Sequence, residues 1–590
     1  MAFNSLPIDA LKMKMDEAVR FLSISLSIAN AHTVDFYTRD VWSTFISVSP
    51  DEVLSAINSS VRAGAAEGKK NTTFGFCNTT KKLVDVSAIL MAAKEHSLSG
   101  LEVCMQLEEL MHDLKLMSGD IVAGERMDRC VVPGEFMNCK KSHEVRAMSE
   151  VVNGLAKCCK VKQVIDVGSG KGYLCTFLSV QFNLQVFGID SSSTNTHGAQ
   201  ERNRKLKKFS KAYKKHSRAM RNQEAEPSND GNDRTEKHSI SDQEVRPTND
   251  STQAESCASQ VQVTTDVSSK KAIECIADTN DCDGDGFFNM LSPDIIEDNS
   301  PRVHPSQLSE EEKERRKREN LERKTREGLS NCSDDSLFSP LTSYVTAETE
   351  LKTLITELED AVLVGLHTCG DLAPSTLRMF RAKQELRAVC SVGCCYHLLS
   401  EEFDPDRQEC TDGVCGFPMS QFLKDQACFC GRNARMSACL ALERVSAGGG
   451  LPMESLFFRA VLHVILRDHY DSFKSEKRVG NVYSKATSFV DYVRRALKKL
   501  DLDDSELPDD VIQNYHERYS HRMNEMVAFN MLKVTLAPCI EGLILLDRLC
   551  YLKEQENVSH SALVQLFDPL QSPRCYAIVG INFDGKGLSK

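Results

Sequence analysis

The chain of 590 residues is too long for one ordinary domain, so its length predicts two or three packed units. A net charge of −12 at pH 7 excludes a protein that coats nucleic acid by bulk charge, although it leaves room for a local basic groove. The N-terminus lacks the apolar core of a secretory signal, and no stretch reaches the apolar length needed to span a bilayer. We therefore expect a cytoplasmic or nuclear protein with no membrane contact, whose 23 cysteines are thiols or metal ligands.

Residues 1–125 predict a helical N-terminal region. The stretches 11–38 and 100–118 both repeat apolar residues at positions i, i+3 and i+4, which is the spacing of one helix face. Gly119 is expected to end the second helix, because glycine readily adopts the backbone conformation that follows a last helical turn. The remaining residues, 126–590, predict a second, larger domain.

From about residue 160, short apolar stretches alternate with helical ones, which predicts an α/β fold. The expected strands are "KQVIDVG" (162–168), "LQVFGID" (184–190), "LTSYVT" (341–346), "DAVLVGLH" (360–367) and "LRAVCSVGCC" (386–395). Helical segments between most of them imply a parallel sheet with right-handed crossovers. Near the C-terminus, "ALVQLFDPLQSPRCYAIVGIN" (562–582) predicts two further strands joined by a proline-containing turn, which return the chain to the same sheet.

Two insertions interrupt this pattern. Residues 205–338 are dominated by polar side chains and cannot bury enough apolar surface to offset the entropy of ordering, so they predict a long disordered insertion. Its two ends are basic, which suits either solvated helices or contact with phosphates. Residues 440–560 predict a C-terminal helical insertion ahead of the last two strands.

The first expected strand ends in an acid and a glycine turn. Asp166, Gly168, Gly170 and Gly172 form the pattern D-x-G-x-G-x-G, in which a carboxylate would repel a pyrophosphate but would suit a cationic amine. S-adenosylmethionine carries such an amine. Asp190 ends the second strand, where an acid can accept hydrogen bonds from both ribose hydroxyls. The competing interpretation is that both aspartates only cap turns at strand–helix junctions.

A second set of polar residues follows the fourth and fifth expected strands. His367 and Cys369 end the fourth, and Cys395, Tyr396 and His397 end the fifth. Ligands of open parallel sheets bind at the carboxyl ends of the strands, so we expect these side chains to line one crevice with the glycine turn. A histidine there could act as a general base or orient the acceptor, and the tyrosine is a further catalytic candidate.

Zinc is the rival interpretation of the cysteines in this part of the chain. Seven potential ligands lie within a short distance in sequence: Cys394, Cys395, His397, Cys410, Cys415, Cys428 and Cys430. They lack the regular C-x-x-C spacing of structural zinc sites, and cysteines on strands are commonly small buried side chains. The sequence therefore assigns no metal ligand.

The stretch "MNCKKSHEV" (137–145) precedes the first strand. Its polar residues, Lys140, Lys141, His143 and Glu144, lie where a helix covering the cofactor pocket would begin. Lys141 is therefore a candidate cofactor contact, and the alternative is a solvated first helical turn.

Together, these stretches resemble the methyltransferase-like protein 25 family of class I S-adenosylmethionine-dependent methyltransferases. The segments that carry the resemblance are "MNCKKSHEV", "VIDVGSGKGYL", "GLHTCGDLAPSTLRMF", "VGCCYHLL", "GFPMS", "EGLILLDRLCYL" and "LFDPLQSPRCYAIV". The resemblance implies a Rossmann-like methyltransferase domain over residues 126–590, with cofactor contacts at the four residues of the glycine turn pattern and at Asp190.

The acceptor is less defined by the resemblance. The "HTCG" and "CCYH" sequences are also similar to a family of eukaryotic tRNA ribose 2′-O-methyltransferases, which favours RNA. They depart from the Pro-Pro-aromatic sequence that usually accompanies methylation of an adenine amine. Protein methylation and a non-catalytic, cofactor-binding scaffold are the alternatives, and a basic groove leading to the crevice would favour RNA over protein.

Overall fold

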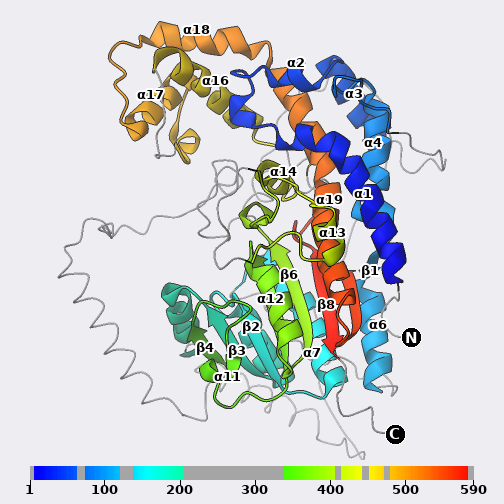
Figure 1. The fold of residues 1–590 in the computed structure, drawn as a ribbon. Coiled ribbons are helices and arrows are strands. Elements are labelled where there is room, and N and C mark those ends of the chain that lie inside the picture. Colours follow the sequence, from blue (N-terminus) through cyan, green and yellow to red (C-terminus); the bar gives the residue numbers. More distant parts are fainter. Residues whose placement is uncertain are drawn as a thin grey trace, which may run out of the picture. The chain divides into compact units, whose positions relative to one another are not determined.

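An eight-stranded sheet lies at the centre of the computed structural model, with the strand order β1-β7-β8-β6-β5-β2-β3-β4 (Figure 1). The structure describes residues 6–62, 74–119, 137–204, 338–405, 414–440, 445, 451–470 and 479–582. Arg204 alone among these belongs to a second unit, residues 204–275. The strands are β1 (Cys104–Gln106), β2 (Gln163–Val167), β3 (Gln185–Asp190), β4 (Ser339–Thr342), β5 (Ala361–Cys369), β6 (Leu386–Cys394), β7 (Val558–Gln565) and β8 (Tyr576–Asn582).

Strands β2 to β6 are mutually parallel, and β8 runs antiparallel between β6 and β7. The Rossmann-like sheet and its closing C-terminal hairpin are therefore confirmed. The third expected strand lies slightly earlier in the chain than its sequence suggested, since β4 ends at Thr342. Because the carboxyl ends of β2, β3, β5 and β6 all meet at one edge, the polar residues that follow them are brought to the same side of the sheet.

Helices cover both faces of the sheet. Described helices in contact with it include α7 (Cys139–Cys159), α8 (Tyr173–Phe182), α12 (Leu372–Ala382) and α19 (Met523–Lys553), and the short α11 (Leu351–Leu354) precedes β5 in the chain. Strand β2 is buried along its whole length, as expected for a central parallel strand. Its side chains alternate between two cores, so that Val164 packs with α7 and α8, and Ile165 packs with α12 and the C-terminal helices.

The N-terminal region is helical with one exception. Its helices are α1 (Ile8–Asn30), α2 (Val41–Phe45), α3 (Pro50–Arg62), α4 (Val86–Glu95), α5 (Leu98–Leu101) and α6 (Leu107–Ser118). The expectation of one helix over 100–118 is wrong, because Glu102 adopts a left-handed conformation that ends α5, and Cys104–Gln106 forms β1 beside β7. A capping box between Gln106 and Glu109 then starts α6, and Gly119 ends it as predicted.

The predicted C-terminal helical region is confirmed between β6 and β7, but its helices begin at Gln421 rather than near residue 440, and β7 starts at Val558, before the predicted end at 560. It contains α13 (Gln421–Asp425), α14 (Arg432–Ser437), α16 (Met453–His469), α17 (Phe489–Leu500), α18 (Asp509–Ser520) and α19 (Met523–Lys553). By length and composition α19 is able to cross a membrane, which corrects the expectation that no stretch is long enough. However, 83% of its most apolar window is buried inside the protein, as in the central helix of a globular core.

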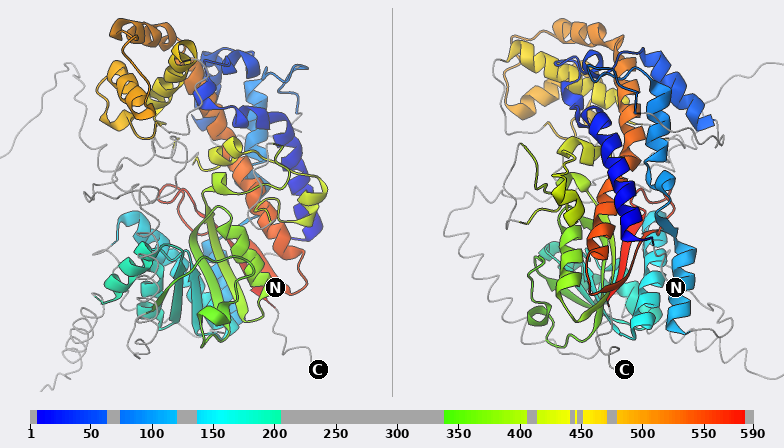
Figure 2. Two further views of the ribbon diagram at one scale, coloured as in Figure 1. Left: turned by 60° about the vertical axis from the view of Figure 1, so that its left-hand side comes forward. Right: turned by 45° about the vertical axis from the view of Figure 1, so that its right-hand side comes forward.

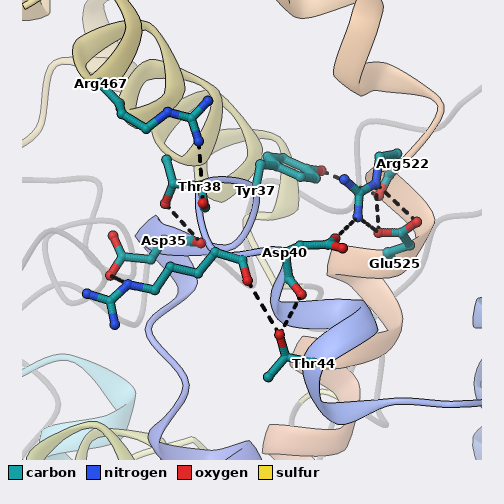
Figure 3. A network of polar contacts seen from close by, with 9 residues as sticks. Asp35, Tyr37, Thr38, Asp40, Thr44, Arg467, Arg522 and Glu525 are labelled. Atoms are coloured by element: carbon teal, nitrogen blue, oxygen red, sulfur yellow. Dashed lines mark hydrogen bonds and ion pairs between the residues drawn. The ribbon is translucent and has the colours of Figure 1, made fainter.

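The helices from the two ends of the chain pack on each other. Both views in Figure 2 show α1 alongside α19, and the two helices are in contact. Figure 3 shows how the connection between α1 and α2 is attached: Arg522 pairs with Asp40 and Glu525, and the Arg467 guanidinium donates a hydrogen bond to the carbonyl of Thr38 at 3.3 Å. The N-terminal region and the helical insertion therefore support each other beside the sheet.

The predicted disordered insertion, 205–338, lies outside the described residues apart from its last one. Phe338 is buried in the core beside α8, directly before β4. On the other side of the insertion, Asn203 donates a side-chain hydrogen bond to the Phe338 carbonyl at 2.8 Å. The two ends of this long tract are thus joined at the sheet.

Candidate functional site

The glycine turn after β2 has the open backbone that a ligand requires. Gly168, Gly170 and Gly172 have φ angles of 73°, 54° and 70°, in the left-handed region that favours glycine. A Cβ added to Gly172 would overlap the ring of Phe338, so packing requires glycine at that position. A Cβ at Gly170 would meet nothing within 4 Å. Gly170 is therefore exposed to open space at the edge of the sheet, where a bound molecule could approach the backbone.

Asp166 lies at the start of this turn and is almost completely buried. Cys175 of α8 donates a hydrogen bond to Oδ2 at 3.1 Å, whereas Oδ1 has no hydrogen-bond partner among the described residues. Burial raises the pKa of Asp166 to about 7. A buried carboxylate oxygen without a donor is energetically costly, and a cationic amine would supply both the donor and the charge that it lacks.

Asp190 holds the glycine turn against the end of β3. Its Oδ2 accepts from the backbone N–H of Gly170 at 2.9 Å, and its Oδ1 accepts from Ser192 N–H and Asn195 Nδ2 at 2.8 and 3.2 Å. Asp190 therefore caps this turn, as the competing interpretation expected for both aspartates, whereas Asp166 accepts no backbone hydrogen bond among the described residues. Capping does not exclude ligand binding, because a carboxylate has about four lone-pair sites and can accept hydroxyl hydrogen bonds as well.

A buried carboxylate, Glu144, links α7 to the carboxyl end of β5. The helix begins at the cap residue Asn138, and its first turns direct Lys141 and Glu144 toward the sheet. Glu144 Oε2 accepts from His367 Nε2 at 2.9 Å and from Lys141 Nζ at 3.0 Å. Its Oε1 accepts from Ser572 Oγ at 2.7 Å. One fully buried acid thus brings together a helix, a strand end and the loop between β7 and β8.

His367 reaches Glu144 because the backbone leaves the regular strand at this point. Its φ of 66° is left-handed, and the register with β6 shifts between Leu366 and Thr368. Such irregularities redirect side chains and concentrate at functional sites. The imidazole is the candidate catalytic group predicted from the sequence, and it is now placed beside a carboxylate that can orient it.

The charges around Glu144 and His367 determine which of the two groups carries a proton. Burial raises the pKa of Glu144, but His367, Lys141 and Lys140 outweigh that effect and hold the pKa well below its usual range. Burial lowers the pKa of His367 in spite of the neighbouring carboxylate. Of the two directions, that of the buried His367 decides the state of the pair: its lowered pKa makes the imidazole neutral, and the Nε2–H hydrogen bond and the two lysine ammonium groups then keep Glu144 ionised. The proton on Nε2 is donated to Glu144, which leaves the lone pair on Nδ1 as the basic site.

Lys141 was expected to contact a cofactor, and that role remains a prediction. Its Nζ bonds to Glu144, while Lys140 Nζ lies 3.7 Å from the other oxygen of the same carboxylate. Both ammonium groups stabilise the ionised glutamate.

Tyr396 follows β6 and is packed into the protein interior. Its hydroxyl donates to Glu541 of α19 at 2.8 Å, and the guanidinium groups of Arg548 and Arg574 each lie 5.7 Å from its ring centre. Burial, followed by the charge of Glu541, raises the pKa of Tyr396 well above its ordinary value. A neutral phenol that is bonded to Glu541 supports the end of β6, and its predicted catalytic role is untested.

The other candidates after β5 and β6 fall into two environments. His397 is buried in the short helix 396–398, and its catalytic role also remains a prediction. Cys369 and Cys395 are partly exposed, and their sulfur atoms lie together with that of Cys394. The structure therefore joins His367 to Glu144 and groups the cysteines separately.

Glu144 and Ser572 were the contributions that sequence reasoning missed. Glu144 was noted only as part of the start of α7, although its spacing of three residues from Lys141 placed both on one helix face. Ser572 is 428 residues away from Glu144, and no local pattern connects the two.

Comparisons with known proteins point to the same part of the chain. A family model described as a methyltransferase domain matches residues 140–402, which extend from α7 to just beyond β6. A protein from Homo sapiens described as probable methyltransferase-like protein 25 is 47% identical over 97% of this chain and 97% of its own length. The protein of the same description from Mus musculus is 47% identical over 96% of each chain. No solved structure matches.

Proposed function

Because the chain belongs to the methyltransferase-like protein 25 family, we propose that it transfers a methyl group from S-adenosylmethionine to RNA, with His367 as the general base. The observation that carries the proposal is the placement of a glycine turn with an unpaired buried carboxylate oxygen at the same sheet edge as a histidine oriented by Glu144. We call the first group, Asp166 to Asp190, the cofactor half. The carboxyl ends of β5 and β6, with Glu144, are the acceptor half.

In the cofactor half, Asp166 Oδ1 would accept from the cofactor amine, and Asp190 would accept from the ribose hydroxyls. Gly170 allows close approach of the backbone. The N-terminus of α8 would stabilise the cofactor carboxylate. When bound, S-adenosylmethionine supplies a methyl group on a positively charged sulfur.

In the acceptor half, His367 Nδ1 would remove a proton from the acceptor hydroxyl as the methyl group is transferred. The acceptor oxygen would exchange its proton, which passes to the imidazole, for the methyl group, and the cofactor would leave as the neutral thioether. Glu144 stabilises the imidazolium that forms, because its negative charge lies 2.9 Å from Nε2. General bases of this kind contribute about 10²- to 10⁴-fold to a rate.

A hydroxyl of RNA is favoured as the acceptor by the "HTCG" and "CCYH" sequences, which are similar to those of ribose 2′-O-methyltransferases. A neutral imidazole suits that chemistry, since a hydroxyl must lose its proton on methylation whereas an amine nucleophile can attack before it does. We place the activity in the cytoplasm or the nucleus, where such RNA is found.

The test is transfer of a labelled methyl group in an extract from cells that lack the protein. The purified protein is added back with labelled S-adenosylmethionine, and the His367→Ala variant serves as the matched control. We expect label in the RNA fraction with the wild type and none with the variant. Label that appears only in protein would reject RNA as the acceptor, and equal labelling by both proteins would reject His367 as the base.

A further inference from the structure

Three cysteine thiols gather at the carboxyl ends of β5 and β6, beside the acceptor half. The sulfur atoms of Cys369, Cys394 and Cys395 all lie within 4.8 Å of one another, and those of Cys369 and Cys394 are 3.1 Å apart. Among the described residues, no fourth histidine, cysteine or acid joins this group. The proposed methyl transfer uses none of the three thiols, so their grouping needs another explanation.

The backbone conformation of Cys395 brings its thiol to those of Cys369 and Cys394. Cys369 and Cys394 are paired in register across the parallel strands β5 and β6, so their side chains start out as neighbours. Side chains of consecutive strand residues normally point to opposite faces, which would direct Cys395 away from Cys394. However, Cys395 has a left-handed φ of 50°, and its thiol joins the group instead. Non-glycine residues keep such a conformation only where the surrounding structure maintains it.

A buried positive charge next to the thiols provides a second observation. Arg548 of α19 is almost completely buried and its guanidinium lies against Gly393, where a Cβ would overlap with Nη1. Its Nη2 has no hydrogen-bond partner among the described residues. Asp547 and Asp371 are acids that interact with this charge. Thiolates beside a buried guanidinium would add to that negative charge, whereas neutral thiols would not.

We propose that Cys369, Cys394 and Cys395 bind one zinc ion as thiolates, with the fourth coordination position open on the partly exposed side of the group. Three thiolates and Zn²⁺ carry a net charge of −1, which would add to the negative charge beside Arg548. Tetrahedral zinc with bonds of about 2.3 Å to sulfur separates its sulfur ligands by about 3.8 Å. The Cys369–Cys394 separation of 3.1 Å is shorter than that value, and none of the three separations exceeds 4.8 Å, so small side-chain adjustments would accommodate the ion.

Ligand type narrows the choice of ion. Thiolates favour zinc and other soft metals, whereas magnesium and calcium prefer oxygen ligands. A disulfide between Cys369 and Cys394 is the competing outcome, but it would use only two of the three thiols and would not account for the position of Cys395. The proposal rests on the thiols and Arg548, and it is independent of the cofactor and of His367.

The test measures metal content in the full-length protein, purified under reducing conditions without chelators. Elemental mass spectrometry is expected to find about one zinc per chain. After dialysis against a competing chelator, Cys369→Ser and Cys395→Ser should each retain less than about one tenth of the zinc that the wild type retains. Cys390→Ala is the matched control, because Cys390 is buried on the same strand but lies outside the group, and it should retain zinc like the wild type.

Cobalt substitution gives a readout of the ligand type. Cobalt bound by thiolates produces a charge-transfer absorption in the near ultraviolet, which should appear in the wild type and in Cys390→Ala and should be weakened in Cys395→Ser. Cys395 is partly exposed, so its variant remains informative if Cys369→Ser does not fold.

Three results would overturn the proposal. The wild type could bind neither zinc nor cobalt. Intact mass and peptide mapping could show Cys369 and Cys394 joined as a disulfide, with two hydrogens lost. Zinc could also be retained equally in all variants, which would place the ion elsewhere in the chain.

Discussion

The cofactor half and the acceptor half each contain one buried acid, and the two acids are in opposite states. Asp166 has one oxygen without a hydrogen-bond donor among the described residues, and burial raises its pKa to about 7. Glu144 is bonded to His367, Lys141 and Ser572, and its pKa lies well below the usual range. The first acid has a place for an external partner, whereas the second already has its partners within the protein. This difference suits a site that binds a ligand beside one that orients a base.

The two halves also differ in where their residues come from. The cofactor half is formed by consecutive segments around β2 and β3. The acceptor half depends on distant parts of the chain, since Glu144 meets His367 across 223 residues, and Tyr396 meets Glu541 across 145. Glu541 also binds Arg574 next to β8. The helical insertion therefore supports the acceptor half, and substitutions in α19 should affect the acceptor more than the cofactor.

The largest expected effect is a loss of catalytic rate on substitution of His367, in the acceptor half. His367→Ala should lower kcat by about 10²- to 10⁴-fold, because the acceptor hydroxyl loses its base. Cofactor affinity measured by calorimetry should stay within a few-fold, since His367 belongs to the other half. His469→Ala is a suitable control, because that histidine bonds to Tyr515 in the helical insertion. A parallel loss of cofactor binding in His367→Ala would show that the two halves are not separate.

The next effect concerns Asp166 in the cofactor half. Its substitution should raise the stability of the cofactor-free protein and lower the affinity for the cofactor. The pKa of Asp166 in the folded protein, about 7, lies above its value of about 3.9 in the unfolded chain. Its contribution to folding stability is therefore fully present below about pH 4 and is lost as pH rises through about 7. Asp166→Asn should therefore raise the free energy of unfolding of the cofactor-free protein by roughly 2–4 kcal/mol at pH 8. The same variant should bind S-adenosylmethionine more weakly, because the amine loses its anionic partner.

Denaturant titration at pH 5 and pH 8 measures the first effect, and calorimetry measures the second. The variant should gain much less stability at pH 5, where Asp166 is largely protonated. Asp360→Asn, an exposed acid at the start of β5, serves as the control for loss of a charge. A stability gain that is equal at both pH values, or unchanged cofactor affinity, would contradict the assignment of Asp166.

A smaller effect is expected from Glu144→Gln, which retains most of the hydrogen-bonding geometry and removes the charge. Glu144 is a positioning residue. Loss of the acids that orient metal-bound histidines costs about 10- to 100-fold in activity, and we expect a loss of similar size here. Its negative charge raises the pKa of His367, so its removal should move the acid limb of the kcat–pH profile to lower pH. A lower kcat with an unmoved profile would mean that Glu144 has only a structural role.

The same contrast explains what the sequence could predict. The glycine turn and Asp190 were predictable because strand, turn and acid follow one another locally, and periodicity identified most of the strands. The pairing of Glu144 with His367 and Ser572 depends on tertiary contacts that no spacing rule describes. Strand β1 was missed because three residues between two helices do not interrupt a helical pattern strongly enough. Arg548 was passed over within the apolar stretch "EGLILLDRLCYL", although its buried guanidinium lies against Gly393, next to Cys394 in the chain.

The smallest expected effect comes from the largest change, the deletion of residues 215–335. In the sequence this tract lies between β3 and β4, and its composition predicts that it contributes no core. The hydrogen bond from Asn203 to Phe338 joins the two flanking segments at 2.8 Å, so a short flexible linker can replace the tract with little cost in loop closure. Thermal unfolding should begin and end at nearly the same temperatures as in the full chain, and cofactor affinity should be unchanged.

Asn203→Ala in the shortened chain should lower the melting temperature more than the deletion itself does, because it removes the hydrogen bond that joins the two flanking segments. A large loss of stability on deletion alone would instead mean that the tract packs on the cofactor half. The tract would then have to be counted as part of that half.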